Sequence, residues 1–143
     1  MTPILTAEQI EDFLAREFPQ IYAAGPVFEC VNVAAGTATL RFHRNEAHLR
    51  PGGTVSGPSL FALADVAAYV AVLAHIGPVA LALTTNLNIN FLNRAEAVPL
   101  DGVCRILKLG RSLAMLEVSI ERVDTRQIIA HATTTYSIPP AKT

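Results

Sequence analysis

Charged residues are scarce in this 143-residue chain, and neither sign is in excess. They make up 16% of the sequence, against roughly 25% in a typical soluble domain. The 11 basic and 12 acidic residues leave a formal net charge of −1, which excludes a nucleic-acid-binding protein that works through bulk positive charge. Apolar residues make up 51%, and this composition excludes an intrinsically disordered chain.

A long uninterrupted apolar run is also missing. The most apolar stretch, Leu60–Ile76, spans 17 residues and contains Asp65 and His75, whereas a transmembrane helix needs about 20 apolar residues. We therefore expect no membrane association, and because no signal peptide is visible we expect a cytoplasmic protein. The mean hydropathy of +0.37 is still high. Self-association as a homodimer or homotetramer explains this value better than a membrane does.

The chain contains only two cysteines, Cys30 and Cys104, and their spacing matches no metal-binding motif. We expect both to be buried thiols. His43 and His48 lie near one loop, but no further histidine or cysteine stands at ligand spacing to this pair. The sequence therefore predicts no metal site.

The pattern of apolar residues predicts two helices and six strands in one domain over residues 1–143. Thr6 and Gln9 form a capping box that begins a short amphipathic helix, which Pro19 ends. An alanine-rich segment, Gly57–His75, predicts a long helix that is apolar almost all round and therefore buried on nearly every side. The predicted strands are Val27–Val33, Thr37–His43, Thr84–Phe91, Gly102–Leu109, Leu113–Arg122 and Gln127–Ile138.

Short turns join most of these strands, so neighbouring strands must be antiparallel. One long apolar helix beside a run of antiparallel strands is accommodated when the sheet curls around the helix. The sequence therefore predicts an α+β fold of this kind, whose open edges invite a second subunit.

Asp65 is the candidate catalytic residue because it is the only formally charged side chain between Pro51 and Arg94. Burying an unpaired carboxylate is costly, so Asp65 requires a partner, a raised pKa or access to a cleft. Such a group is a functional candidate. The alternative is that Asp65 only hydrogen-bonds a loop or lies at a subunit interface.

The glycine-rich segment Gly52–Pro58 leads into the long helix. Free backbone N–H groups at a helix start can stabilise a developing oxyanion, and the Gly57 amide is the best candidate because Pro58 has no N–H. The alternative interpretation is a tight turn into the helix.

The segment Ser56–Asp65 resembles the His-Gly-Gly-x-Leu-x-x-Leu-x-Asp motif of hotdog-fold acyl-CoA thioesterases, most closely the phenylacetate-degradation type of the 4-hydroxybenzoyl-CoA thioesterase superfamily. The Asn-Phe-Leu-Asn-Arg run that ends at Arg94 and the Lys108–Arg111 turn are also similar, and the resemblance covers roughly residues 42–137. The eight-residue interval from Gly57 to Asp65 is its most specific part.

This resemblance implies a hotdog fold, a dimer or tetramer, and hydrolysis of an acyl-CoA thioester in which CoA is part of the substrate and no further cofactor is needed. By position, Asp65 would be the general base or nucleophile, and the Gly57 amide would polarise the thioester carbonyl. The sequence departs from the motif at three places, with Ser56 for the family histidine, Pro58 for the second glycine and Arg50 for a frequent asparagine. Ser56 then either contacts the acyl group or caps the helix.

Other residues are candidates for substrate binding. Basic residues between positions 94 and 111 could hold the CoA phosphates, or could lie on a solvated strand face: Arg94, Arg105, Lys108 and Arg111. Asn86, Asn88 and Asn90 form a polar stripe that contacts either substrate, solvent or a second subunit. Tyr69 lies one turn after Asp65 and either shapes the acyl pocket or packs in the core.

Two rival functions remain at this point. A hydroxyacyl-thioester dehydratase of the same fold would pair a loop histidine, here His48, with a helix acid. A non-catalytic acyl-CoA-binding protein would keep the fold without turnover, which the residues Ser56 and Pro58 would explain.

Overall fold

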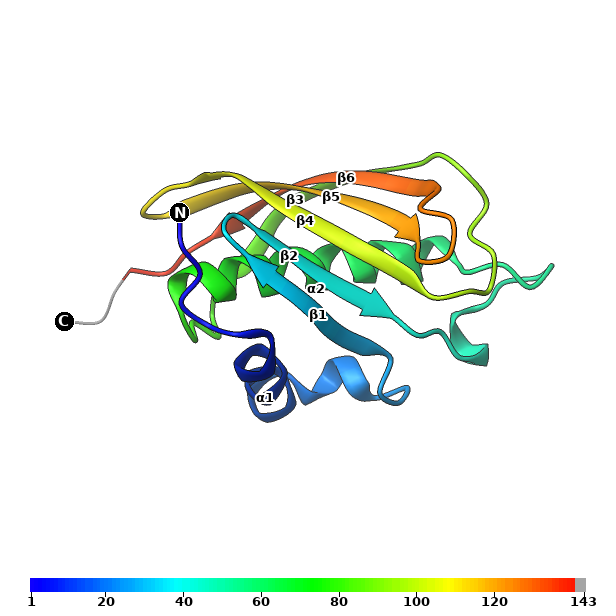
Figure 1. Cartoon of the computed structure of the whole chain (residues 1–143), viewed down its shortest axis with the longest axis horizontal. Coiled ribbons are helices and arrows are strands. Elements are labelled where there is room, and N and C mark those ends of the chain that lie inside the picture. The colour runs from blue at the N-terminus through cyan, green and yellow to red at the C-terminus, as the bar shows by residue number, and fades with distance from the viewer. Residues whose placement is uncertain (141–143) are drawn as a thin grey trace.

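The computed structural model describes residues 1–140, which form one layer of sheet wrapped around a long helix (Figure 1). Two short 3-10 helices, Pro19–Tyr22 and Glu46–His48, lie in the connections. The main elements in chain order are α1 (Ala7–Glu17), β1 (Phe28–Ala34), β2 (Thr37–Phe42), α2 (Gly57–Ile76), β3 (Leu83–Phe91), β4 (Leu100–Leu109), β5 (Leu113–Arg122) and β6 (Ile128–Ser137).

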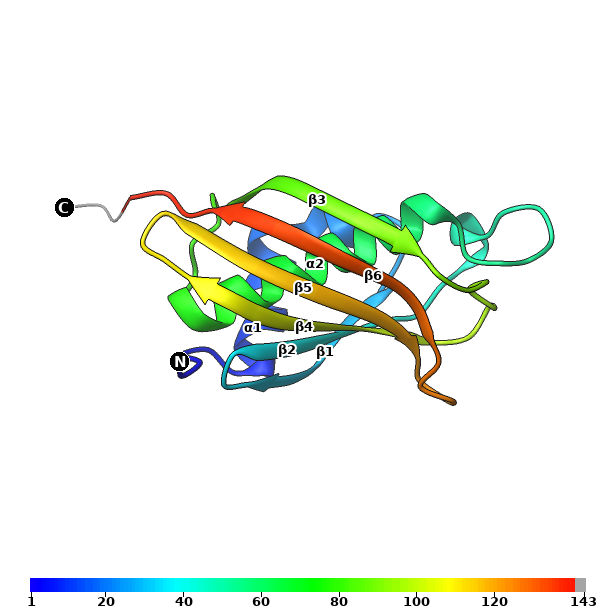
Figure 2. The ribbon, with the colours of Figure 1, turned by 90° about the horizontal axis from the view of Figure 1, so that it is seen from above.

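The six strands form one antiparallel sheet in the order β1-β2-β4-β5-β6-β3. The predicted α+β fold, with a sheet around one central helix and a short N-terminal helix, is confirmed. Strand ends differ by one or two residues from the sequence prediction; β4, for example, begins at Leu100 rather than Gly102. The predicted loop after β2 also contains the second 3-10 helix. Figure 2 shows the sheet from its outer face, with α2 running beneath the strands.

The core lies between α2 and the concave face of the sheet. Thirteen of the 20 residues of α2 are buried, including the whole run from Val66 to His75. The helix has the length and hydropathy of a membrane span, but the sheet of its own chain covers most of it. At Gly102 the contact is so close that an added Cβ would lie 3.1 Å from Ala67 Cβ. This glycine is what lets β4 approach the helix.

The helix ends where the residues predict. Gly77 forms the C-cap with φ of 100°, a conformation that favours glycine. His75, in the last turn, is buried, and its ring links two elements, because Nε2 accepts a hydrogen bond from the Gly36 N–H at 2.9 Å while Nδ1 donates to Ala71 O at 2.8 Å. The ring therefore joins the end of α2 to the β1–β2 turn.

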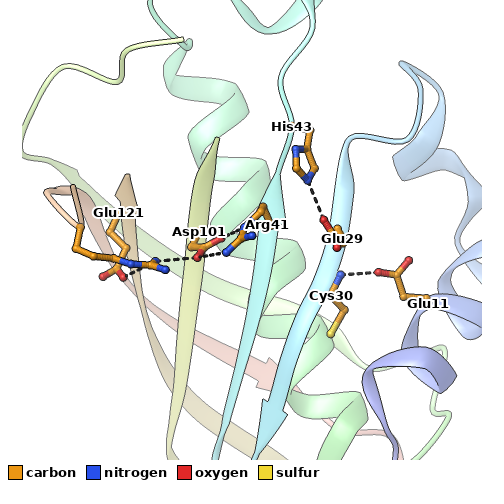
Figure 3. Close-up of polar contacts among 8 residues, drawn as sticks. Glu11, Glu29, Cys30, Arg41, His43, Asp101 and Glu121 are labelled. Atoms are coloured by element: carbon orange, nitrogen blue, oxygen red, sulfur yellow. Dashed lines mark hydrogen bonds and ion pairs between the residues drawn. The ribbon is translucent and has the colours of Figure 1, made fainter. Parts of the chain in front are cut away.

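The N-terminal helix α1 covers the β1 side of the molecule (Figure 1). Thr6 and Gln9 form the predicted capping box, and Ile10, Phe13 and Leu14 make the buried face. The carboxylate of Glu11 accepts a hydrogen bond from the Cys30 N–H at 2.6 Å, which satisfies one donor on this outer strand (Figure 3). An edge strand with unpaired donors is a site for unwanted pairing, and α1 reduces that exposure.

On the outer face, Asp101 is buried beneath an ion-pair cluster (Figure 3). Arg41 donates two hydrogen bonds to its carboxylate, at 2.8 and 3.1 Å, and Arg126 donates a third at 2.8 Å. Arg126 also contacts Glu121. Burial by itself would raise the pKa of Asp101, but the hydrogen bonds and charges of the two arginines hold it below its ordinary value.

The opposite edge of the sheet is β3, which pairs only with β6 within the described part of the chain. Its predicted alternation is confirmed: Leu87, Ile89 and Phe91 lie on the concave face, and the three asparagines lie on the outer face. Apolar side chains are exposed along this side of the molecule, and Phe61 is 41% and Phe91 54% exposed.

Candidate active site

Asp65 lies in the third turn of α2, half-buried, on the side of the helix that faces the two strands β3 and β6. Thr84 Oγ1 donates a hydrogen bond to Asp65 Oδ1 at 2.5 Å. The Tyr136 hydroxyl lies 2.8 Å from the same oxygen and 2.9 Å from the Asp65 carbonyl oxygen. The carboxylate thus has the partners that its burial demands.

A hollow of about 420 Å³ opens beside Asp65. Its wall is largely aromatic and apolar, with polar groups from α1 and the following 3-10 helix at its rim. The residues that line it are Glu17, Phe18, Gln20, Asp65, Val66, Tyr69, Ala80, Ala82, Leu83, Thr84 and Tyr136. A carboxylate at the wall of a concave, mostly apolar space is the arrangement expected of a small-molecule site.

Tyr69 lines this hollow and is also part of the buried core, so the contacts alone do not choose between its two predicted roles. Its hydroxyl donates to the Ala80 carbonyl at 3.0 Å. Its ring stacks on Tyr136 with centroids 6.2 Å apart and meets the edge of Phe18 at 5.8 Å. Burial, and secondarily the charge of Glu17, raises the pKa of Tyr69. The three rings form a fixed aromatic wall.

The start of α2 faces a different hollow, of about 330 Å³, which Arg50, Gly57, Phe91 and Arg94 help to line. Ser56 is the N-cap, with its hydroxyl accepting from the Ser59 N–H at 3.4 Å, so in this structure it caps the helix. The Gly57 N–H has no hydrogen-bond partner within residues 1–140. It is available to an external acceptor at the positive end of the helix dipole.

An apolar depression lies next to this amide on the β3 side. It has a volume of about 470 Å³ and is lined by Gly57, Pro58, Phe61, Ile89 and Phe91. A Cβ added at Gly57 would lie 3.5 Å from the Phe91 ring, which places the end of β3 beside the start of the helix.

Gly57 and Asp65 do not meet within one chain. Eight residues of helix, at about 1.5 Å each, put them about 12 Å apart along the axis. An attacking atom must approach within about 3.5 Å of the carbonyl carbon, and an oxyanion donor within about 3.1 Å of the oxygen. One helix therefore does not present both groups to a single thioester.

The other predicted binding residues lie apart from Asp65. Arg94 lines the Gly57 hollow. Lys108 and Arg111 are at the β4–β5 turn, at the opposite end of the sheet from the start of α2 (Figure 2). Arg105 pairs with Glu117 on the outer face. Asn90 pairs with His131 on that face and does not enter the Asp65 hollow.

His48 does not approach Asp65 either. Its Nδ1 accepts a hydrogen bond from the Asn45 N–H at 2.9 Å, and its ring meets the edge of Phe42. The hollow that it lines does not include Asp65. The histidine and acid that a dehydratase would pair are therefore not brought together in one chain. Within residues 1–140, no three histidine, cysteine or acidic side chains are grouped as metal ligands.

Two residues of the site, Thr84 and Tyr136, were not among the candidates from the sequence. Burial, and secondarily the charge of Asp65, raises the pKa of Tyr136, so its hydroxyl keeps its proton. Both residues stand at inward positions of their strands, directly opposite one another in the β3–β6 register. The alternation of β6 indicates that Tyr136 faces the helix, but no local signal indicates that it meets Asp65.

A six-stranded antiparallel sheet wrapped around one long buried helix is the hotdog fold. The comparisons with known proteins agree. The family model of the thioesterase superfamily matches residues 52–129. A candidate thioesterase from Silicibacter sp. TM1040 is 44% identical, with a TM-score of 0.88 over 98% of this chain and 96% of its own. The chain therefore belongs to the thioesterase superfamily and is a hotdog-fold thioesterase.

More distant structures share the fold. A mutant form of the phenylacetic acid degradation protein PaaI from Thermus thermophilus is 22% identical, with a TM-score of 0.72 over 85% of this chain and 99% of its own. A protein from Streptococcus mutans UA159, solved bound to acetyl CoA, is 20% identical, with a TM-score of 0.71 over 81% and 91%. No curated protein matches the sequence.

Proposed function

We propose that the protein hydrolyses an acyl-CoA thioester to the free acid and CoA, with Asp65 as the base or nucleophile. One observation carries this proposal: a half-buried carboxylate on an otherwise apolar helix, held by Thr84 and Tyr136 at the wall of a hollow. Membership of the thioesterase superfamily supplies the reaction class. The acetyl CoA bound to a structural neighbour supports CoA as the carrier.

In the general-base form of the reaction, Asp65 accepts a proton from water as the water oxygen attacks the thioester carbonyl carbon. The C–S bond then breaks, and the leaving thiolate takes that proton to give CoA and the free acid. A carboxylate positioned in this way contributes about 10²–10⁴-fold in rate. The chemistry requires no cofactor beyond the CoA moiety of the substrate.

The oxyanion donor in this proposal is the Gly57 amide of a second copy of the chain. Along β3, Thr84 contacts Asp65 at one end, and Phe91 lies beside Gly57 at the other. If two β3 strands pair antiparallel across a two-fold axis, the Phe91 end of one copy lies opposite the Thr84 end of its partner. This arrangement brings the Gly57 amide of one copy toward the Asp65 carboxylate of the other.

The open edge of β3 supports such a dimer. An unpaired edge strand carries free N–H and C=O groups that can extend the sheet into a second copy. Phe61 and Phe91 are exposed beside this edge, and the apolar depression that they line would be covered by the partner. A dimer of this kind would also bury part of the apolar surface that this chain exposes.

The CoA phosphates have candidate partners near the Gly57 amide, at one end of the proposed dimer. Arg94 and Arg50 line the Gly57 hollow, and no acidic side chain among residues 1–140 lines it. In the two-fold arrangement, the end of the partner that carries Lys108 and Arg111 faces this hollow. Arginine is suited to phosphate because its planar fork donates two parallel hydrogen bonds.

The test is release of free thiol from a series of acyl-CoAs, measured for the wild type and for Asp65→Asn. We expect Asp65→Asn to lower kcat about 10²-fold or more while leaving Tm within a few degrees, because Asn Oδ1 can accept the same two hydroxyl hydrogen bonds. Asp12→Asn, on the exposed face of α1, is the matched control. Full activity in a folded Asp65→Asn protein would overturn the proposal. Binding of CoA esters without thiol release by the wild type would indicate a non-catalytic carrier.

A further inference from the structure

Both hydroxyl contacts to the Asp65 carboxylate fall on one oxygen. Thr84 Oγ1 lies 2.5 Å from Oδ1 and the Tyr136 hydroxyl lies 2.8 Å from it. The other oxygen, Oδ2, receives no hydrogen bond from any residue between 1 and 140. The two oxygens of this carboxylate therefore have different surroundings, although the group itself is symmetric.

The Tyr136 hydroxyl has one proton and two acceptors within reach, Oδ1 and the carbonyl oxygen of Asp65. The carbonyl already accepts the helical hydrogen bond expected from the Tyr69 N–H four residues on. An ionised carboxylate is the stronger acceptor, because hydrogen bonds to a charged group are roughly twice as strong as neutral ones. The proton of Tyr136 therefore belongs mainly to the bond with Oδ1.

Tyr136 is only 2% exposed, and its ring is fixed by stacking on Tyr69. It is therefore a rigid donor on β6, while Thr84 is a second donor on the neighbouring strand. The χ2 torsion of an aspartate is broad and roughly two-fold, so a carboxylate with no such contacts samples many orientations. Two donors from two strands on one oxygen remove that freedom.

From this asymmetry we infer that Tyr136 is a positioning residue, which fixes Asp65 so that Oδ2 is the oxygen that accepts the proton from water. This inference rests on the proposed thioester hydrolysis. Tyr136 acts through Asp65 and takes no part in bond making itself. Oδ2 is protonated as the C–O bond forms, and it returns the proton to the thiolate once the C–S bond has broken.

The experiment compares kcat, KM and Tm for the wild type, Tyr136→Phe and Thr134→Val. Thr134 is the matched control, because it is a buried inward residue of the same strand whose hydroxyl donates to the Asn86 carbonyl of β3, away from Asp65. We expect Tyr136→Phe to lower kcat about ten- to a hundredfold, the scale of one hydrogen bond to a charged group. KM should change less than about twofold. Thr134→Val should lower Tm and leave the kcat of the folded protein unchanged.

Thr84 provides an independent measurement if Tyr136→Phe fails to fold. Thr84→Val removes the second donor to Oδ1 at nearly constant volume, and we expect the same selective loss of kcat. Thr84→Ser retains the hydroxyl and should recover most of that loss, which a purely structural role would not require.

The outcomes separate this inference from the proposed function. A wild type that is active while Asp65→Asn is inactive supports the proposed function. If Tyr136→Phe then keeps more than half of kcat, or if KM rises while kcat is retained, the inference about Tyr136 is overturned and the reaction stands. A wild type without thiol release from any acyl-CoA overturns both.

Discussion

Gly57 and Asp65 lie on the same helix, eight residues apart, and face different hollows of the molecule. The sequence motif indicates two candidate catalytic groups, the amide at the start of the helix and the carboxylate in its third turn. Along a rigid helix they stay about 12 Å apart. One helix therefore does not place both groups at a single thioester, and the proposed dimer would combine the Gly57 amide of one copy with the Asp65 carboxylate of the other.

We expect two inactive variants to restore activity when they are mixed. Asp65→Asn removes the carboxylate, and Gly57→Pro removes the amide while keeping a residue that suits the first helical position. In a mixed dimer, one of the two sites combines a native Asp65 with a native Gly57. Thiol release after co-refolding of equal amounts should reach about a quarter of the wild-type rate, since about half of the dimers are mixed.

Gly57→Ala is the matched variant for this experiment. Its Cβ would lie at an ordinary contact distance of 3.5 Å from the Phe91 ring, and it keeps the backbone N–H. We expect it to retain at least tenfold more kcat than Gly57→Pro, because loss of one oxyanion donor costs about 10²–10³-fold. If the mixture stays inactive although each variant folds and dimerises, the shared-site arrangement is wrong.

Phe18→Ala should extend the range of acyl groups. Phe18 closes the wall of the Asp65 hollow and meets the edge of Tyr69 at 5.8 Å. Removing its ring lengthens the apolar space, and each further buried CH₂ group contributes about 0.8 kcal/mol, or roughly fourfold in kcat/KM. The measurement is kcat/KM across a series of straight-chain acyl-CoAs. An unchanged chain-length profile would place the acyl group elsewhere.

Arg111→Ala should weaken CoA-ester binding more than it slows the bound reaction. A phosphate contact far from the thioester stabilises the ground state and the transition state alike, so KM rises while kcat is retained. Arg16→Ala, which removes an exposed arginine on α1, is the control. A large fall in kcat at constant KM would count against a role in CoA binding.

Asp101→Asn should lower stability in a pH-dependent way. The substitution removes the negative charge of Asp101, which pairs with both Arg41 and Arg126 on the outer face. We expect the free energy of unfolding to fall by about 2 kcal/mol at neutral pH. Because the pKa of Asp101 is lowered in the folded protein, its contribution is complete above about pH 4 and is lost as the pH falls through that lowered value. The difference in Tm between variant and wild type should therefore shrink in acid.

The exposed pair of Arg122 and Asp124 provides the control for that measurement. Asp124→Asn removes the same kind of charge at the surface, where water and salt screen the interaction. We expect almost no change in Tm at neutral pH. An equal effect of the two substitutions would show that burial of Asp101 does not strengthen its ion pairs.

Local patterns in the sequence were enough for most of the fold. The capping box at Thr6, the glycine after Ile76 and the alternation of β3 each depend on near neighbours in the chain, and each is confirmed. Asp65 also stands out from local sequence alone, because it is a single carboxylate in an apolar helix, and its catalytic role stays a prediction.

The surroundings of Asp65 were decided by tertiary structure alone. Thr84 is 19 residues from Asp65 in the sequence and Tyr136 is 71, and each comes from a different strand. Their approach depends on the order of strands in the sheet, which places β6 beside β3, and on the register that sets Thr84 opposite Tyr136. Short-range periodicity determines which face a residue takes, whereas strand order and register arise from packing over the whole chain. The sequence by itself therefore determined which carboxylate is the candidate for catalysis, and only the folded sheet determined which hydroxyls contact it.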